Sequence, residues 1–475
     1  MITGGDNPAA IRNLRILACV LLIALTVPRM WQRGMFLDGL IYASVSRNLA
    51  AGDGSWWAPS HTATDDAPFF EHPPLGFWLE AVGFRIAGDS FLVERGFSLL
   101  VFGLHALLVM AMWRRLLPAR YDWIPLFFWI LPEVVTWSVV NNMLENTQAL
   151  FTSAAVYCLV RTVGDSSARA QGGWSVLAGV SVVAATLTKG PVGLFPLAVP
   201  LLLPLLARPP FHRLFLVWTS MTTVVVAAAM TLAVLPAPSH NLAEYLRRQL
   251  GPSLRGEREV ASPRFPFLSY FVAAIFARIA VVAGTLAAFR FRSAPALGRI
   301  NPITWFFLLT GAMASLPIAM SPKMAGHYFV PAVPFLALAA ASYVMPAVDR
   351  YEWIKSERKQ HMPLFLAAAL LVAAIVVPVV HGPIEPRDLD TVASLDSIAA
   401  AMPRGAIVGT CRAEQYDWSF ATYLQRFFRV SVEAQDAAIG GWFVSPNGAC
   451  PPPPPDCQPA ANGQTVVLYR CSDTR

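Results

Sequence analysis

The sequence predicts an α-helical polytopic membrane protein with a small α/β domain at its C-terminal end. Of its 475 residues, 55% are hydrophobic and 14% are charged, with a mean hydropathy of +0.50, whereas soluble domains average about 25% charged residues. Apolar stretches of about 20 residues, long enough to cross a bilayer as helices, recur along the chain. After residue 380 charged residues become more frequent, and four of the six cysteines follow. The sequence shows no glycine-rich phosphate loop and no zinc-ligand spacing, which argues against a soluble nucleotide-binding enzyme.

The apolar stretches give about eleven predicted membrane spans. They lie near residues 12–30, 91–113, 123–141, 145–162, 174–188, 190–207, 214–236, 265–289, 302–320, 328–346 and 363–380. The fifth and sixth are short because Lys189-Gly190-Pro191 divides one long apolar run. Proline suits a helix start and an unpaired lysine is rare at mid-bilayer, so we predict a tight turn there. The first span resembles a signal peptide but has no small-residue cleavage site, and we keep it as a span.

Basic residues concentrate in every second loop, which is typical of cytoplasmic loops. With a cytoplasmic N-terminus, the inner segments hold Arg12, Arg15, Arg114, Arg115, Arg120, Arg161, Arg169, Arg208, Arg213, Arg290, Arg292, Arg299, Arg350, Lys355, Arg358 and Lys359. This orientation explains the formal net charge of +7 better than nucleic-acid binding does, and we expect no nucleic-acid partner. Residues 1–380 are the predicted transmembrane domain, whose first loop (31–90) and flexible loop (237–264) lie outside together with the tail (381–475).

The tail reads as a small extracytoplasmic α/β domain. Short β-like runs at 406–411, 428–433 and 465–470 alternate with helix-like runs at 391–402 and 415–427. In an oxidising compartment its four cysteines allow one or two disulfides, with three possible pairings. These cysteines are Cys411, Cys450, Cys457 and Cys471.

The first loop carries titratable side chains close to the predicted membrane surface. Residues 38–50 have helical spacing with an apolar stripe, which predicts an interfacial helix that begins near Asp38. Asp38 is either the N-cap of that helix or a catalytic carboxylate. Glu71 and His72 precede Pro73-Pro74, whose restricted backbone holds both side chains in one direction.

A second carboxylate, Glu145, lies in the turn 141–146, where the third and fourth predicted spans meet outside. It also reads either as helix capping or as a functional group. Carboxylates are hard oxygen ligands, so a divalent cation such as Mg²⁺ or Mn²⁺ shared by Asp38 and Glu145 is a further hypothesis. No other cofactor is indicated.

Several cations lie where the charge rule disfavours them. They are Lys189, Lys323, His327 and the arginines Arg247, Arg248, Arg255, Arg258 and Arg264 of the loop 237–264. Arg278 stands near the middle of the eighth predicted span, where a charge needs protein, water or an anion beside it. The alternative to a bound anion is an ion pair with a structural partner such as Glu133 of the third predicted span. The set predicts a bound anionic group such as a lipid phosphate. The alternative is a ring of headgroup-binding residues without chemistry.

Three groups of residues resemble the GT-C superfamily of membrane glycosyltransferases, above all the lipid A aminoarabinose transferase and protein O-mannosyltransferase-like families. They are Asp38, Tyr42, Pro73-Pro74-Leu75 and Trp78-Leu79 in the first loop, the turn Leu187-Thr188-Lys189-Gly190-Pro191, and Lys323, Tyr328, Pro331 and Pro334. The likeness spans residues 12 to about 346.

The resemblance implies transfer of a sugar from a polyprenyl phosphate carrier to an acceptor at the outer face of a bacterial inner membrane, usually with inversion. It makes Asp38 the general base, Glu145 a second acidic position, and Lys189 and Lys323 phosphate contacts. We add His72, Arg278, Arg247 and Arg255 as expected phosphate contacts, and Tyr42, Glu71, His327 and Tyr328 as expected substrate contacts. The N-terminus is then cytoplasmic and the C-terminal domain periplasmic. The acceptor stays open between a lipid, a glycan and a protein.

Two departures from the family pattern bear on the site. Relatives often have a second acid where this chain has Gly39, which weakens the metal hypothesis. Many have a lysine where this chain has His72, which puts one phosphate contact in doubt. A transporter or flippase of lipid-linked sugars is the alternative function, but the two halves show no clear repeat. A third hypothesis is an assembly factor whose tail binds an envelope partner.

Overall fold

The computed structural model describes residues 7–65, 67–164, 167–258, 300–319, 321–349, 360–412, 418–446, 450 and 455–472. The chain forms two compact units. The helical unit comprises Met1–Pro28, Ser98–Val140 and Leu144–His381, and the loop-and-tail unit comprises Arg29–Phe97, Asn141–Met143 and Gly382–Arg475. The unit that contains the tail thus also includes the whole first loop (31–90), which the sequence analysis assigned to the transmembrane domain.

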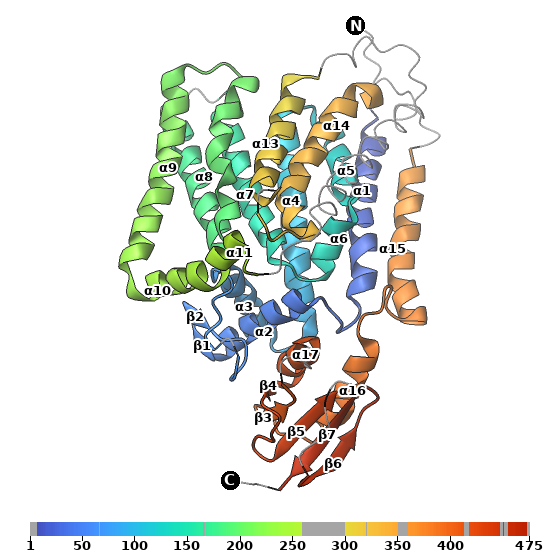
Figure 1. Cartoon of the computed structure of the whole chain (residues 1–475). Coiled ribbons are helices and arrows are strands. Elements are labelled where there is room, and N and C mark those ends of the chain that lie inside the picture. The colour runs from blue at the N-terminus through green and yellow to red at the C-terminus, as the bar shows by residue number, and fades with distance from the viewer. Residues whose placement is uncertain are drawn as a thin grey trace. The chain divides into compact units, whose positions relative to one another are not determined.

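The helical unit is built from α-helices linked by shorter 3₁₀ and π segments (Figure 1). Its elements, of which α1 and α4 extend into the other unit, are α1 (Pro8–Met30), α4 (Phe91–Leu116), η1 (Ala119–Tyr121), α5 (Ile124–Ile130), α6 (Glu133–Val140), α7 (Leu144–Thr162), α8 (Ala168–Lys189), η2 (Pro191–Leu205), α9 (Phe211–Val234), α10 (Pro236–Tyr245), η3 (Leu246–Leu250), α11 (Gly251–Arg255), α13 (Pro302–Ala319), η4 (Gly326–Ala332), α14 (Val333–Asp349) and α15 (Met362–His381).

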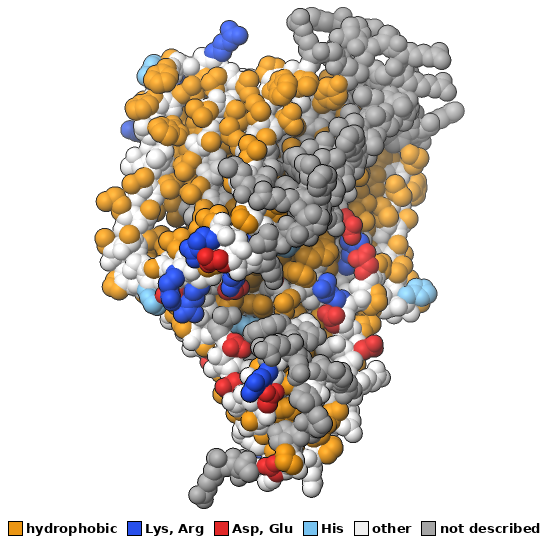
Figure 2. Space-filling view, viewed as in Figure 1, with side chains coloured by type: hydrophobic (Ala, Val, Ile, Leu, Met, Phe, Trp, Pro, Cys, Tyr) orange, Lys and Arg blue, Asp and Glu red, His pale blue; other side chains and the backbone are white. Residues whose placement is uncertain are grey.

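Six helices in the described part of the chain are long and apolar enough to cross a membrane. They are Pro8–Met30, Phe91–Leu116, Ala168–Lys189, Phe211–Val234, Gly326–Pro346 and Met362–His381. The predicted span 123–141 corresponds to a pair of helices that are together long and apolar enough to span but are bent by 79°, because Pro132 interrupts the helical hydrogen bonds. Counted as one broken span, the pair makes a seventh in the described part of the chain. Hydrophobic side chains are prominent on the described surface of the helical unit that is visible in Figure 2. The count of eleven spans stays a prediction, and the eighth, with Arg278, lies outside the described residues.

The predicted turn between the fifth and sixth spans is confirmed. Helix α8 ends at Lys189, Gly190 has φ 89°, and η2 begins at Pro191. The helix α8 packs against α7, α9 and η2, side by side with α7 and α9 in Figure 1. The segment η2 is a 3₁₀ helix, since prolines at every fourth position lack the N–H that an α-helical bond requires; they are Pro196, Pro200 and Pro204.

The tail forms the predicted α/β domain. Its helices are α16 (Leu389–Ala399) and α17 (Trp418–Phe428), and its strands are β3 (Ile407–Thr410), β4 (Ser431–Ala434), β5 (Trp442–Pro446), β6 (Cys457–Asn462) and β7 (Val466–Cys471). The sheet order is β4-β3-β5-β7-β6, in which β3 is parallel to β4 and β5, and β7 is antiparallel to β5 and β6. The disulfides are Cys411–Cys450 and Cys457–Cys471, one of the three possible pairings.

The first loop contributes α2 (Leu37–Ala51), the short hairpin β1 (Gly54–Ser55) and β2 (Ala58–Pro59), and α3 (Leu75–Ala87). The predicted helix at 38–50 is confirmed, and its residues 39, 40 and 42–49 are buried, polar ones included. The cause is tertiary, since α2 packs against both α3 and the tail helix α17. Leu40 and Ala43 share one apolar core with Tyr423 and Leu424.

Buried arginines join the first loop to the tail. Arg426 of α17 is 1% exposed and contacts Glu94 at 2.7 Å and Asp89 at 2.8 Å. Arg47 of α2 donates to the carbonyl oxygens of Gln425 and Arg426, and burial lowers the pKa of Arg47 to about 10. Because buried charges are retained only where partners satisfy them, this network fixes α2 against the tail.

Candidate active site

The helical unit holds a buried ion pair at one end of α7. The Lys189 Nζ lies 2.6 Å from the Glu145 Oε1, with the side chains 11% and 1% exposed. Glu145 lies in the first turn of α7 and Lys189 in the last turn of α8, so each charge also meets the favourable end of its helix dipole. Two residues that are 44 positions apart in the sequence are thus brought into direct contact.

Two aromatic residues and a histidine surround this pair. The His327 Nε2 lies 3.5 Å from the same Glu145 oxygen. The imidazole of His327 stacks on Trp137 with ring centroids 5.5 Å apart, and Tyr328 meets it edge-on at 4.7 Å. The Lys189 ammonium stands 5.4 Å from the centre of the Tyr328 ring, within the range of a cation–π contact. We call Trp137, Glu145, Lys189, His327 and Tyr328 the lysine cluster.

The local sequence explains how Lys189 reaches this position. Gly190 ends α8 with φ 89°, a conformation that favours glycine, and Pro191 starts the next segment. A Cβ atom on Gly190 would lie 2.1 Å from the Tyr245 Oη, so α10 packs directly on the turn. Both the backbone angle and the close approach of Tyr245 therefore require glycine beside the lysine.

The loop-and-tail unit holds a second set of polar side chains at the start of α2. The Tyr42 Oη lies 3.0 Å from the His72 Nε2 and 3.4 Å from the Asp38 Oδ2. The N-cap of α2 is Phe36, so the interpretation of Asp38 as the cap residue is wrong. Asp38 is half-buried in the first helical turn, near the positive end of the helix dipole. We call Asp38, Tyr42 and His72 the aspartate cluster.

Close packing against the turn 141–143 fixes the start of α2. The Phe36 amide donates to the Asn141 Oδ1 at 2.8 Å. A Cβ atom on Gly39 would lie 2.0 Å from the Asn141 carbonyl oxygen. This contact gives a physical reason for Gly39, since a larger residue beside Asp38 would push α2 away from the turn.

A buried carboxyl group, Glu80 of α3, links α2 to the same turn. Its Oε1 accepts from the Asn142 amide at 2.7 Å, and its Oε2 lies 2.7 Å from the Ser46 Oγ. Burial raises the pKa of Glu80 to about 7. The Ser46 hydroxyl donates to the Glu80 Oε2 and also lies 2.8 Å from the Tyr42 carbonyl oxygen, so it joins α3 to the backbone of α2.

The other predicted site residues lie outside these two clusters. Arg247 pairs with Glu244 at 2.6 Å and Arg255 with Glu257 at 2.6 Å, each on the surface. Lys323 is half-buried and precedes η4, while Glu71 is half-buried beside His72 in the chain. Arg278 lies outside the described residues.

The metal hypothesis stays a prediction. Among the described ranges, no group of three or more His, Cys, Asp or Glu side chains is arranged to hold a metal ion. Asp38 and Glu145 belong to different compact units. The observed partner of Glu145 is the ammonium of Lys189.

Sequence reasoning missed three residues that shape these sites: Trp137, Tyr245 and Glu80. Trp137 lies in an apolar segment and Tyr245 in a more polar one, and neither belongs to a local motif. Only the fold brings Trp137 to His327 and Tyr245 to Gly190. Glu80 offered a signal, since a carboxylate in the apolar segment that follows Pro73-Pro74 requires a partner.

Comparison with known proteins gives partial matches in sequence. Residues 71–237 match the family of dolichyl-phosphate-mannose-protein mannosyltransferases. A curated relative, undecaprenyl phosphate-alpha-4-amino-4-deoxy-L-arabinose arabinosyl transferase 2 of Proteus mirabilis, is 23% identical over 360 residues. That match covers 73% of this chain, and the chain spans 62% of the relative's length.

The fold comparison covers nearly the whole chain. The crystal structure of ArnT from Cupriavidus metallidurans bound to undecaprenyl phosphate has a TM-score of 0.67 and 17% identity, covering 97% of this chain and 98% of that one. The oligosaccharyltransferase AglB from Archaeoglobus fulgidus, in complex with an inhibitory peptide and a dolichol-phosphate, has a TM-score of 0.52 and 13% identity, covering 92% and 69%. The chain therefore has the fold of the GT-C superfamily of membrane glycosyltransferases and resembles its aminoarabinose transferase and protein mannosyltransferase members.

Proposed function

We propose that this protein transfers a sugar from a polyprenyl phosphate carrier to an acceptor at the outer face of a bacterial inner membrane. The observation that carries the proposal is the shared fold, which covers nearly all of this chain and of a protein crystallised with undecaprenyl phosphate. The chemistry of the two polar clusters supports it, because they supply a carboxylate and a buried ammonium, the two groups that transfer from a phosphate leaving group needs.

In this proposal Asp38 is the general base. Transfer forms a bond from the acceptor oxygen or nitrogen to the anomeric carbon and breaks the bond from that carbon to the phosphate oxygen. Asp38 takes the proton of the nucleophile, and the bonding electrons leave with the polyprenyl phosphate. The Tyr42 hydroxyl lies between the Asp38 carboxylate and the His72 imidazole, so it orients the carboxylate.

Lys189 stabilises the charge that develops on the leaving phosphate. The Lys189 ammonium, held 2.6 Å from the Glu145 carboxylate, is a compact point charge of the kind that binds phosphate oxygens. Low exposure strengthens the interaction of such a cation with an anion relative to bulk water. Glu145 then acts as a positioning residue that holds Lys189, which refines its predicted catalytic role. Lys323 and His72 are further phosphate contacts in the proposal.

The test measures transfer from a panel of polyprenyl-phosphate sugars to lipid, glycan and Ser/Thr-peptide acceptors, with mass analysis of the products. Asp38→Asn is expected to lower turnover by about 10²- to 10⁴-fold, the usual contribution of a general base. Asp53→Asn is the matched control, since Asp53 is an exposed aspartate of the same loop. Its turnover is expected to equal that of the wild type.

Two results would contradict the proposal. Wild-type turnover in a correctly folded Asp38→Asn variant would remove Asp38 from the mechanism. Translocation of a lipid-linked sugar in proteoliposomes, with no covalent product from any acceptor, would favour the flippase alternative. Assays with and without EDTA, followed by Mg²⁺ or Mn²⁺ addition, test the metal hypothesis separately.

A further inference from the structure

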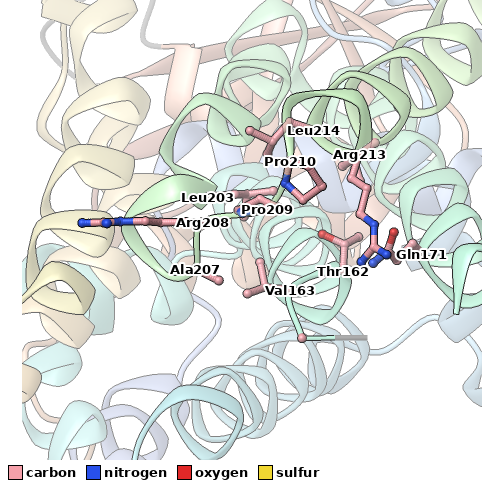
Figure 3. Close-up of a pocket in the computed structure, with 12 residues that line it drawn as sticks. Thr162, Val163, Gln171, Leu203, Ala207, Arg208, Pro209, Pro210, Arg213 and Leu214 are labelled. Carbon is pink, nitrogen blue, oxygen red and sulfur yellow. The ribbon is translucent and has the colours of Figure 1, made fainter. Parts of the chain in front are cut away.

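A cavity of about 340 Å³ opens at the end of α7 opposite the lysine cluster. Helix α7 runs from beside Glu145 to Thr162, so the cavity lies about 25 Å from the ion pair at 1.5 Å per residue. The end of α7, the start of α8, the end of η2 and the start of α9 form its walls (Figure 3). Its size falls at the lower end of the range for small-molecule sites.

The charged residues that line the cavity are all positive. Arg208 and Arg213 line it, and the described lining residues include no carboxylate. Neither arginine forms an ion pair with another residue in the described part of the chain, although this protein pairs many of its surface arginines. In Figure 3 the Arg213 side chain runs toward Thr162 and Gln171, while Arg208 extends in the opposite direction.

Two helix ends add to this positive potential. Gln171 lies in the first turns of α8, which begins at Ala168, and Arg213 lies in the first turn of α9, which begins at Phe211. Helix N-termini carry partial positive charge and unpaired N–H groups that favour anions. Two arginines and the first turns of two helices therefore contribute to the lining of one cavity, whose other walls are largely apolar.

The surface around the cavity identifies the kind of anion. Elements η2 and α9 also present large apolar side chains with high exposure; they are Leu201 at 75%, Phe211 at 81%, Phe215 at 51% and Leu216 at 58%. A free inorganic anion gains nothing from such a surface. A phospholipid gains from both, because its acyl chains cover the apolar side chains while its phosphate meets the arginines.

We propose that this cavity binds the headgroup phosphate of an anionic phospholipid such as phosphatidylglycerol, with its acyl chains along η2 and α9. The site is separate from the lysine cluster and does not depend on the proposed transferase activity. It makes a membrane phospholipid a structural ligand of the bundle.

The test uses the full chain, purified in detergent, delipidated and incubated with phosphatidylglycerol or phosphatidylcholine of the same chain length, with lipid retention measured by native mass spectrometry. We expect retention of phosphatidylglycerol over phosphatidylcholine. The double variant R208A/R213A is expected to bind phosphatidylglycerol about 30-fold more weakly, since each basic residue near an anionic lipid contributes about fivefold. R213A alone is expected to lose about fivefold.

Matched variants separate the site from general surface charge. R169A removes one positive charge from an exposed position at the start of α8 that does not line the cavity, and we expect its lipid retention to equal that of the wild type. R208K/R213K retains the charge and should keep most of the affinity, which also shows that the cavity tolerates substitution. Equal retention by R208A/R213A and R169A, or equal retention of both lipids, would overturn the proposal. Competition by millimolar inorganic phosphate that fully displaces the lipid would assign the site to a free anion instead.

Discussion

The ion pair between Lys189 and Glu145 makes a prediction that separates stability from chemistry. Replacement of Lys189 by methionine keeps the apolar stem and removes the charge that lies 2.6 Å from the carboxylate. The Glu145 side chain is 1% exposed, so water cannot replace the lost ammonium without opening the bundle. We therefore expect Lys189→Met to destabilise the folded state strongly.

The expected magnitude follows from the burial of Glu145. Removal of one partner from a buried ion pair costs about 3–5 kcal/mol, whereas replacement of both partners by neutral groups of similar size is often close to neutral. The double variant Lys189→Met/Glu145→Gln is therefore expected to be more stable than Lys189→Met alone, and within about 1–2 kcal/mol of the wild type. The transfer activity of the double variant should remain low, since the phosphate loses its cation.

The assay heats the detergent-solubilised variants and measures the fraction that stays folded by fluorescence-detected gel filtration, with sugar transfer measured in parallel. Arg169→Ala serves as a control for loss of an exposed charge. Wild-type heat resistance of Lys189→Met would refute the argument from burial. A double variant with restored stability and wild-type turnover would show that the pair is structural only.

Three further predictions concern the loop-and-tail unit. Gly39→Ala places a methyl group 2.0 Å from a carbonyl oxygen and is expected to lower stability by about 1–3 kcal/mol, whereas Gly103→Ala, with open space around it, is neutral or stabilising; heat resistance distinguishes them. The contribution of Glu80 to stability is expected to fall as pH rises from about 4.5 to 7, by an amount on the order of 3 kcal/mol, because burial raises the pKa of Glu80 to about 7 and the folded state alone keeps the proton. Glu80→Gln should flatten this pH dependence in denaturant titrations, and an unchanged slope would contradict the assignment. Cys411→Ser removes a disulfide with a sequence separation of 39 and is expected to lower the stability of the tail by about 4 kcal/mol from loop entropy. Trypsin should then cleave the tail faster, whereas Cys19→Ser should leave the cleavage rate unchanged.

Patterns that extend along the chain were predicted from the sequence. The apolar helices, the turn at Gly190 and the alternation of β3, α17 and β4 in the tail follow from hydrophobic periodicity and from glycine and proline, which act within a few residues. Strands β5 and β6 were not predicted. The sequence Cys457–Asn462 is poor in β-formers, and pairing with β7 determines its conformation.

Contacts between segments that are distant in the chain could not be predicted from the sequence. The apolar stripe at 38–50 predicted the helix α2 but gave no sign that its Arg47 is buried against α17. Hydrophobic periodicity cannot show that a polar side chain has a buried partner nearly 380 residues away. For the same reason Glu145 was interpreted as a helix cap, a catalytic group or a metal ligand, since its partner Lys189 lies on another helix.

By itself the sequence determined that the chain crosses a membrane, that its tail is a disulfide-bearing α/β domain, and which ionisable groups are candidates for chemistry. These conclusions rest on composition, periodicity and residue type, which reflect the preferences of each residue and of its near neighbours in the chain. Only the tertiary structure decided that Lys189 is held by Glu145 and Tyr328, that Tyr42 joins Asp38 to His72, and that α2 is buried beneath the tail. An ion pair or a hydrogen bond depends on distances of a few ångströms between side chains, and those distances are set by packing rather than by position in the chain.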